Sequence, residues 1–123
     1  MANQPTILIV DDDPSIRKMM VEVLNLEGYP TETAENGRVA LELLARSGPR
    51  VVLLDLLMPE VNGWEVMRAL EEDPAERARH RVILVSALNT LETAQDLRAD
   101  GKLVKPFTVN QLLSLVAPAS ASA

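Results

Sequence analysis

The chain of 123 residues contains no cysteine, so disulfide bonds, thiol catalysis and thiolate metal ligands are excluded. Aromatic residues are almost absent too, because Tyr29, Trp64 and Phe107 are the only ones. Hydrophobic residues still make up 47% of the sequence, a normal share for a globular chain. The sequence therefore predicts one domain of ordinary size with a mainly aliphatic core.

Long hydrophobic runs are missing as well. No stretch approaches the roughly 18 apolar residues of a membrane span, and Met1–Pro5 lacks the charged and apolar regions of a signal peptide. We therefore expect a cytoplasmic protein without membrane contact. The net charge of −6 argues against a general surface for nucleic acids or anionic membranes, so we expect no direct nucleic-acid binding.

The chain does contain a series of short apolar runs. Continuous runs rich in β-branched residues are typical of strands that are covered on both faces, as in a parallel sheet. One run is more mixed, and its Pro30 suits an edge strand. We expect five strands in all: Thr6–Val10, Tyr29–Ala34, Val51–Leu54, Val82–Val85 and the weaker Lys102–Val104.

Amphipathic helical patterns lie between these runs. Asp13 followed by Pro14 is typical of an N-cap and a first helical residue. Asn89 and Glu92 have the spacing of a capping box. Five strands that alternate with five helices predict an α/β fold with right-handed crossovers. The five expected N-caps are Asp13, Asn36, Asn62, Asn89 and Thr108.

Some side chains between the motifs also receive a prediction. The basic run Glu76–Arg81 is expected to be a solvated turn, with His80 exposed in it rather than acting as a phosphate relay. Met19, Met20 and Met67 are expected to fill the core. Trp64 is expected to be partly buried, with a role as a partner anchor as the alternative.

Polar residues follow four of the five apolar runs. Asp11 and Asp12 follow the first, Asp55 the third, Ser86 the fourth and Lys105 the fifth. The carboxyl ends of parallel strands lie on one edge of the sheet, so these side chains should converge where ligands bind. Carboxylates suit Mg²⁺, and a hydroxyl and an ammonium suit a phosphoryl group. With Mg²⁺ and the ammonium of Lys105 nearby, Asp55 would stay ionised and could act as a nucleophile.

In these motifs the chain resembles the receiver domains of two-component response regulators. The resemblance covers about residues 5–117 and implies a flavodoxin-like, doubly wound parallel sheet with strand order 2-1-3-4-5, an order for which a member of this family is a standard example. The motifs are Ile-Leu-Ile-Val-Asp-Asp-Asp-Pro at 7–14, Val-Leu-Leu-Asp-Leu-Leu-Met-Pro at 52–59, Asn-Gly at 62–63, Val-Ser-Ala at 85–87 and Val-Lys-Pro-Phe at 104–107.

The resemblance implies roles in phosphoryl transfer. Asp55 would be the phosphoacceptor, Ser86 would hydrogen-bond the phosphoryl oxygens, and Lys105 would pair with the phosphoryl group. The donor would be a histidine kinase or a phosphotransfer protein. Phosphorylation would switch contacts with a downstream protein or a missing output domain, in a monomer or a phosphorylation-dependent dimer. Such a module modifies itself but turns over no metabolite, so we do not expect an enzyme.

The resemblance also implies a magnesium site. Asp12 and Asp55 would bind Mg²⁺ directly, together with the backbone carbonyl of Leu57, and Asp11 would help mainly through water. The family usually has a cis peptide bond before the equivalent of Pro106. The expected domain comprises residues 6–117, with a disordered N-terminus at 1–5 and a flexible tail or the start of a linker at 118–123.

The chain departs from the family pattern at several positions. Lys102 stands where an aromatic residue usually reports phosphorylation, so that switch cannot operate in its common form. The segment between Ser86 and Lys105 is shorter than usual by about one helical turn. Leu57 and Leu88 stand where side chains flank the attacking water. Because two apolar residues cannot orient that water, we expect a long-lived phosphoryl group.

Two other functions stay open. Lys102 and the short fourth helix favour a degenerate receiver that acts as a constitutive interaction module, whereas the acidic pair, Ser86 and Lys105 argue against it. A Mg²⁺-dependent aspartyl-phosphate phosphatase is the third reading. Phosphatases of the haloacid dehalogenase type need a second aspartate two residues after the nucleophile, and Leu57 at that position argues against this reading.

Overall fold

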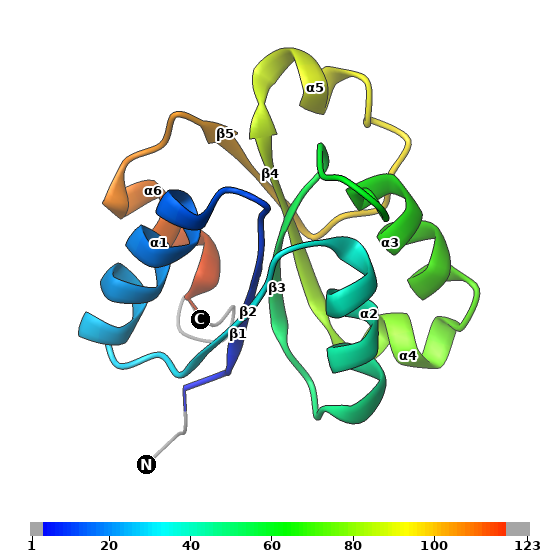
Figure 1. Cartoon of the computed structure of the whole chain (residues 1–123), viewed down its shortest axis with the longest axis horizontal. Coiled ribbons are helices and arrows are strands. Elements are labelled where there is room, and N and C mark those ends of the chain that lie inside the picture. The colour runs from blue at the N-terminus through cyan, green and yellow to red at the C-terminus, as the bar shows by residue number, and fades with distance from the viewer. Residues whose placement is uncertain (1–3, 118–123) are drawn as a thin grey trace.

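Five parallel strands form one sheet in the computed structural model, which describes residues 4–117 (Figure 1). The order is β2-β1-β3-β4-β5, as expected. Of the predicted disordered ends, residues 1–3 and 118–123 lie outside the described residues. The strands are β1 (Ile7–Val10), β2 (Thr31–Ala34), β3 (Val51–Asp55), β4 (Arg81–Ala87) and β5 (Gly101–Lys105).

Six helices are present among residues 4–117, and the expectation of five was wrong. The additional helix is α4, which Asp73 caps by accepting the N–H of Glu76 at 3.2 Å. It has no buried residue, so the sequence shows no apolar face by which to recognise it. The helices are α1 (Pro14–Leu26), α2 (Gly37–Arg46), α3 (Gly63–Glu71), α4 (Pro74–Arg79), α5 (Leu88–Glu92) and α6 (Val109–Val116).

The predicted capping box at Asn89 was also wrong. Strand β4 continues to Ala87, and α5 begins directly at Leu88 without a side-chain cap. Asn89 is therefore already inside the helix, where its side chain cannot reach an unpaired first-turn N–H. The other four N-caps are confirmed, two of them as full capping boxes: Asp13, Asn36, Asn62 and Thr108.

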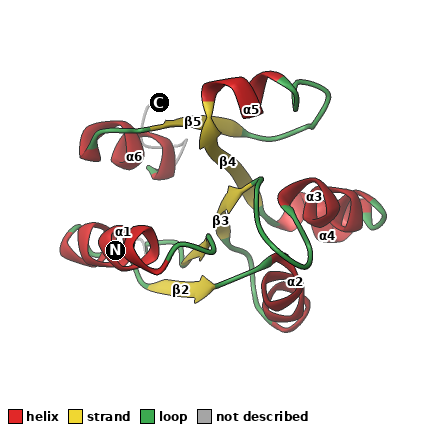
Figure 2. Cartoon of the chain, turned by 45° about the horizontal axis from the view of Figure 1, so that its top comes forward, coloured by secondary structure: helices red, strands yellow, loops and turns green. Residues whose placement is uncertain are grey.

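Helices cover both faces of the sheet (Figure 2). Ile7 and Ile9 pack on the side of α1 and α6, whereas Leu8 and Val10 pack on the side of α2, α3 and α5. All four side chains are at most 1% exposed, because successive residues of a strand point to opposite faces. Within residues 4–117, no helix is long and apolar enough to cross a membrane.

Two side chains lie differently from the sequence-based expectation. His80 is only 4% exposed, so its assignment to a solvated turn was wrong. Its Nδ1 accepts the backbone N–H of Arg50 at 3.1 Å, and its Nε2 lies 3.0 Å from Glu76. Met19 is 39% exposed rather than in the core. Trp64 is partly buried, as expected.

Gly63 begins α3 directly behind the end of β3, where a side chain has no room. A Cβ at this position would lie 2.6 Å from the backbone oxygen of Asp55 and 2.7 Å from the Cα of Leu56. We expect Gly63→Ala to lower the free energy of unfolding by about 1–3 kcal/mol, measured by urea denaturation, because backbone must move.

Gly48→Ala is the matched control for this substitution. The nearest atom to its added Cβ is Nη1 of Arg50 at 3.8 Å, an ordinary van der Waals distance. Its stability should stay within about 0.5 kcal/mol of the wild type. Equal stability of the two variants would contradict the tight contact behind Asp55.

Candidate functional site

The polar residues that follow the strands meet at the carboxyl edge of the sheet, at the top of Figure 1. Asp11 follows β1, Asp55 ends β3, Ser86 is the penultimate residue of β4, and Lys105 ends β5. The parallel register keeps these strand ends close to one level. The predicted convergence is therefore confirmed as a matter of geometry.

Lys105 joins two of the carboxylates. Its Nζ lies 2.9 Å from Asp11 Oδ2 and 3.3 Å from Asp55 Oδ2. Burial lowers the pKa of Lys105, but the hydrogen bond with Asp11 and the charges of Asp55 and Asp11 outweigh it, so the pKa lies above its ordinary value. Lys105 is thus a permanent cation at neutral pH. The peptide bond between Lys105 and Pro106 is cis, as the resemblance implied.

Both oxygens of the Asp55 carboxylate have partners. Oδ1 accepts the hydroxyl of Ser86 at 3.1 Å and the backbone N–H of Leu57 at 3.3 Å, while Oδ2 faces Lys105. Burial raises the pKa of Asp55, Lys105 lowers it and Asp11 raises it, with a net increase over the ordinary value. Lys105 alone therefore does not offset the burial of this carboxylate, and a further cation would favour its ionised form.

Three carboxylates could hold such a cation. Asp11, Asp12 and Asp55 each place one carboxylate oxygen so that all three atoms lie within 4.8 Å of one another. Asp11 and Asp55 are buried, whereas Asp12 is exposed, so the cluster opens to solvent on one side. Mg²⁺ prefers oxygen ligands and keeps some of its waters, so these residues fit the ion. The ligand role of the Leu57 carbonyl stays a prediction.

Arg17 belongs to the surroundings of the site and was missed in the sequence. Its Nη1 donates to the backbone oxygen of Asp11 at 2.6 Å, and Asp11 Oδ1 accepts the N–H of Asp13 at 2.9 Å. These contacts hold Asp11 between the end of β1 and the start of α1. Side chains of a helix lean toward its N-terminus, so an arginine one turn after the cap was a usable signal.

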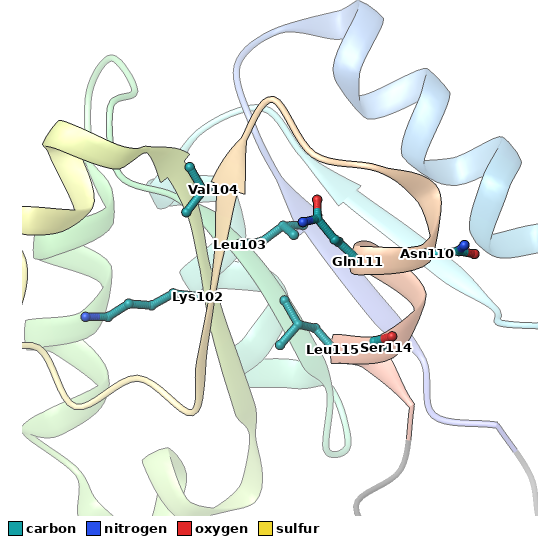
Figure 3. A pocket seen from close by; sticks show the side chains of 7 residues that line it. All are labelled: Lys102, Leu103, Val104, Asn110, Gln111, Ser114 and Leu115. Atoms are coloured by element: carbon teal, nitrogen blue, oxygen red, sulfur yellow. The ribbon is translucent and has the colours of Figure 1, made fainter.

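The residues that depart from the family pattern are all exposed. Leu57 and Leu88 are 59% and 58% exposed. Lys102 is exposed on β5, and Figure 3 shows its side chain pointing away from α6. A groove of about 440 Å³ lies between β5 and α6, and Leu103 and Gln111 are among its lining residues. No residue of the acidic cluster lines this groove, so we do not assign the phosphoryl chemistry to it.

Fold and site together define a doubly wound α/β domain whose acidic cluster fits Mg²⁺ and the chemistry of a phosphoacceptor aspartate. The chain belongs to the response regulator receiver domain family, whose model matches residues 7–117. Receiver domains are the phosphoacceptor modules of two-component signalling, and they are generally not enzymes.

The similar proteins include one of about the same length as this chain and several longer ones. Regulatory protein AtoC of Escherichia coli (strain K12) is 40% identical over 113 residues, 89% of this chain and 24% of that protein. Sporulation initiation phosphotransferase F of Bacillus subtilis (strain 168) is 36% identical over 116 residues, 89% of each chain. The chain spans between 24% and 47% of the first curated relatives it matches.

A solved structure with the same fold holds a metal complex. The response regulator protein TrrA from Thermotoga maritima was crystallised in complex with Mg²⁺ and BeF. It is 34% identical, with a TM-score of 0.80 over 91% of this chain and 96% of that chain.

The raised pKa of Asp55 predicts how this residue affects the stability of the metal-free protein. A raised pKa in the folded state means that the contribution of Asp55 to stability is full below its unfolded pKa and is lost as pH rises through its folded pKa. At pH 7 in EDTA, Asp55→Asn should therefore raise the melting temperature, by about 4 °C for each kcal/mol by which the free energy of unfolding increases. Circular dichroism melts would measure this difference.

Two controls accompany these melts. Asp13→Asn makes the same chemical change at an exposed helix cap and should leave the melting temperature nearly unchanged, since asparagine caps equally well. Added Mg²⁺ should stabilise the wild type, because a ligand that binds the folded state favours folding. It should not stabilise Asp55→Asn, because this variant lacks one of the three carboxylates of the cluster. A lower melting temperature for Asp55→Asn in EDTA would refute the burial cost.

Proposed function

We propose that Asp55 is the phosphorylated residue of this receiver domain and that a histidine kinase or a phosphotransfer protein donates the phosphoryl group. The observation that carries the proposal is the position of Asp55 at the end of β3, between the hydroxyl of Ser86 and the ammonium of Lys105. Asp11 and Asp12 lie beside it with further carboxylate oxygens.

The proposed reaction is a single phosphoryl transfer. An oxygen of Asp55 attacks the phosphorus of a phosphohistidine, so that a P–O bond forms while the P–N bond to the donor imidazole breaks. Lys105 would pair with the phosphoryl oxygens, and Ser86 would turn its hydroxyl from Asp55 to one of them. The chain would modify itself and turn over no metabolite, so we do not propose an enzyme.

The proposed magnesium ligands are the chain's own oxygens. Asp12, Asp55 and the backbone carbonyl of Leu57 would bind the ion directly, and Asp11 mainly through water. When bound, Mg²⁺ would neutralise charge on the phosphoryl oxygens. Lys105 would keep its place between Asp11 and the phosphorylated Asp55, because its Nζ already contacts both side chains.

An apolar groove next to the site offers a surface for the donor protein. It has a volume of about 370 Å³ and is lined by Ile16, Met19, Lys105, Pro106 and Phe107. We propose that phosphorylation then changes contacts with a downstream protein or an output domain. The proposed state is a monomer or a phosphorylation-dependent dimer.

Incubation with acetyl phosphate and Mg²⁺ tests the proposal directly. Intact mass spectrometry should show an addition of roughly 80 Da, one phosphoryl group, on the wild type. Asp55→Asn and an EDTA-treated wild type should show none, because the first lacks the nucleophile and the second the metal. An unmodified wild type, or equal modification of Asp55→Asn, would refute Asp55 as the phosphoacceptor.

The exposed Leu88 predicts slow loss of the phosphoryl group. A glutamate at this position could orient the attacking water, so Leu88→Glu should dephosphorylate at least about tenfold faster, since general-base catalysis contributes roughly 10²-fold or more. Leu88→Met is the matched control, since it keeps an apolar side chain of similar size. The decay of the phosphorylated mass in Mg²⁺, after acetyl phosphate has been removed, measures both rates, and an unchanged rate for Leu88→Glu would contradict the prediction.

A further inference from the structure

A side-chain pair holds the loop between Asp55 and α3 against the start of α2. Nδ2 of Asn36 donates to Oε2 of Glu60 at 2.8 Å. Asn36 is only 5% exposed, and its Oδ1 accepts the N–H of Val39 as the cap of α2. One amide therefore serves the helix with its oxygen and the loop with its nitrogen. We call the Asn36–Glu60 pair the clasp.

The backbone contacts next to the clasp are equally close. The N–H of Gly37 donates to the oxygen of Val61 at 2.9 Å. A Cβ at Gly37 would lie 2.3 Å from that same oxygen, so only glycine permits the contact. The loop is thus fastened to the β2–α2 corner at two successive residues, Glu60 through its side chain and Val61 through its backbone.

The backbone of Glu60 is unusual for its residue type. Its φ is 64°, a left-handed conformation that costs free energy for any residue except glycine. The hydrogen bond from Asn36 compensates for this cost. The ionic partner of Glu60 is Arg38, whose Nε lies 3.7 Å away and whose side chain is largely exposed. An exposed pair of this kind contributes little. The side chain of Glu60 therefore makes a hydrogen bond with Asn36 that a glycine at this position could not make.

The clasped loop carries a group of the proposed metal site. Leu57 donates its N–H to Asp55 Oδ1, and its carbonyl is a proposed ligand of Mg²⁺. At the far end of the loop, the N–H of Gly63 donates to the oxygen of Leu56. The clasp fixes the segment between these two contacts, three residues beyond Leu57.

We propose that Glu60 is a positioning residue: its clasp with Asn36 holds the loop that carries Leu57 and so sets the affinity of the acidic cluster for Mg²⁺. This inference rests on the proposed function, because it requires the acidic cluster to bind Mg²⁺. Groups that orient metal ligands in this way typically change metal affinity by 10- to 100-fold when they are removed.

Magnesium titration of three Glu60 variants tests the clasp. Calorimetry measures the affinity, and the fluorescence of Trp64, the only tryptophan and the second residue of α3, serves as a second measurement. Glu60→Ala should weaken binding about tenfold. Glu60→Gln loses the same charge but keeps an acceptor for Asn36, so its affinity should stay within about twofold of the wild type, given the small worth of the exposed Arg38 pair.

Glu60→Gly separates positioning from stability. Glycine relieves the left-handed backbone, so the melting temperature should stay the same or rise. Because the clasp is lost, the affinity for Mg²⁺ should still fall about tenfold. A merely structural role would move affinity and stability in the same direction, and that outcome would overturn the proposal.

An exchange of the two partners gives a further test. Asn36→Asp keeps the cap of α2 but turns a carboxylate oxygen toward Glu60, so it should weaken Mg²⁺ binding about tenfold, although its added negative charge would by itself favour the cation. The double variant Asn36→Asp/Glu60→Gln restores the hydrogen bond with its polarity reversed, and it has the net charge of the wild type. Its affinity should return to within about twofold.

The outcomes distinguish the clasp from the proposed function. If the wild type binds Mg²⁺ and Glu60→Ala binds it equally well, the clasp has no positioning role while the proposed function stands. A double variant that binds no better than Asn36→Asp would also overturn the clasp. If the wild type neither binds Mg²⁺ nor accepts a phosphoryl group from acetyl phosphate, both proposals fail.

Discussion

The site depends on the ion pairs that the ammonium group of Lys105 makes with two carboxylates. This ammonium lies between Asp11, which follows β1, and Asp55, which ends β3; the two residues are only 2% and 5% exposed. Without a cation between them, two buried carboxylates would repel each other and lose their hydration. This arrangement explains both pKa shifts. Burial lowers the pKa of Lys105, but its two carboxylate partners raise it further. Burial raises the pKa of Asp55 by more than the shared ammonium lowers it.

This imbalance explains why the cluster suits a divalent cation and why the loops around it are so closely fitted. Three carboxylates lie close together and only one ammonium pairs with them, so the cluster has an excess of negative charge until a cation joins it. The ligands must also stay in place without the ion. Gly63 and Gly37 let backbone segments approach where a side chain would collide, and the clasp of Asn36 with Glu60 ties the loop down.

Much of the fold could be predicted because its signals are local. The strands covered on both faces are continuous apolar runs, and four N-caps stand directly before an amphipathic face. The short helices α4 and α5 were misjudged because one or two turns are too few to show a helical period. His80 was misplaced because the chain that covers it includes Arg50, which is distant in sequence.

The sequence by itself determined which chemical groups follow each strand, and a parallel sheet then brings Asp55, Ser86 and Lys105 to one edge. Only the tertiary structure decided how these groups share their contacts: that Lys105 bridges two carboxylates, that Ser86 bonds Asp55 itself, and that Glu60 reaches Asn36. Each of these contacts joins residues that are far apart in the sequence at hydrogen-bond distance. Such distances depend on how helices and loops pack against the sheet, which no local sequence pattern specifies.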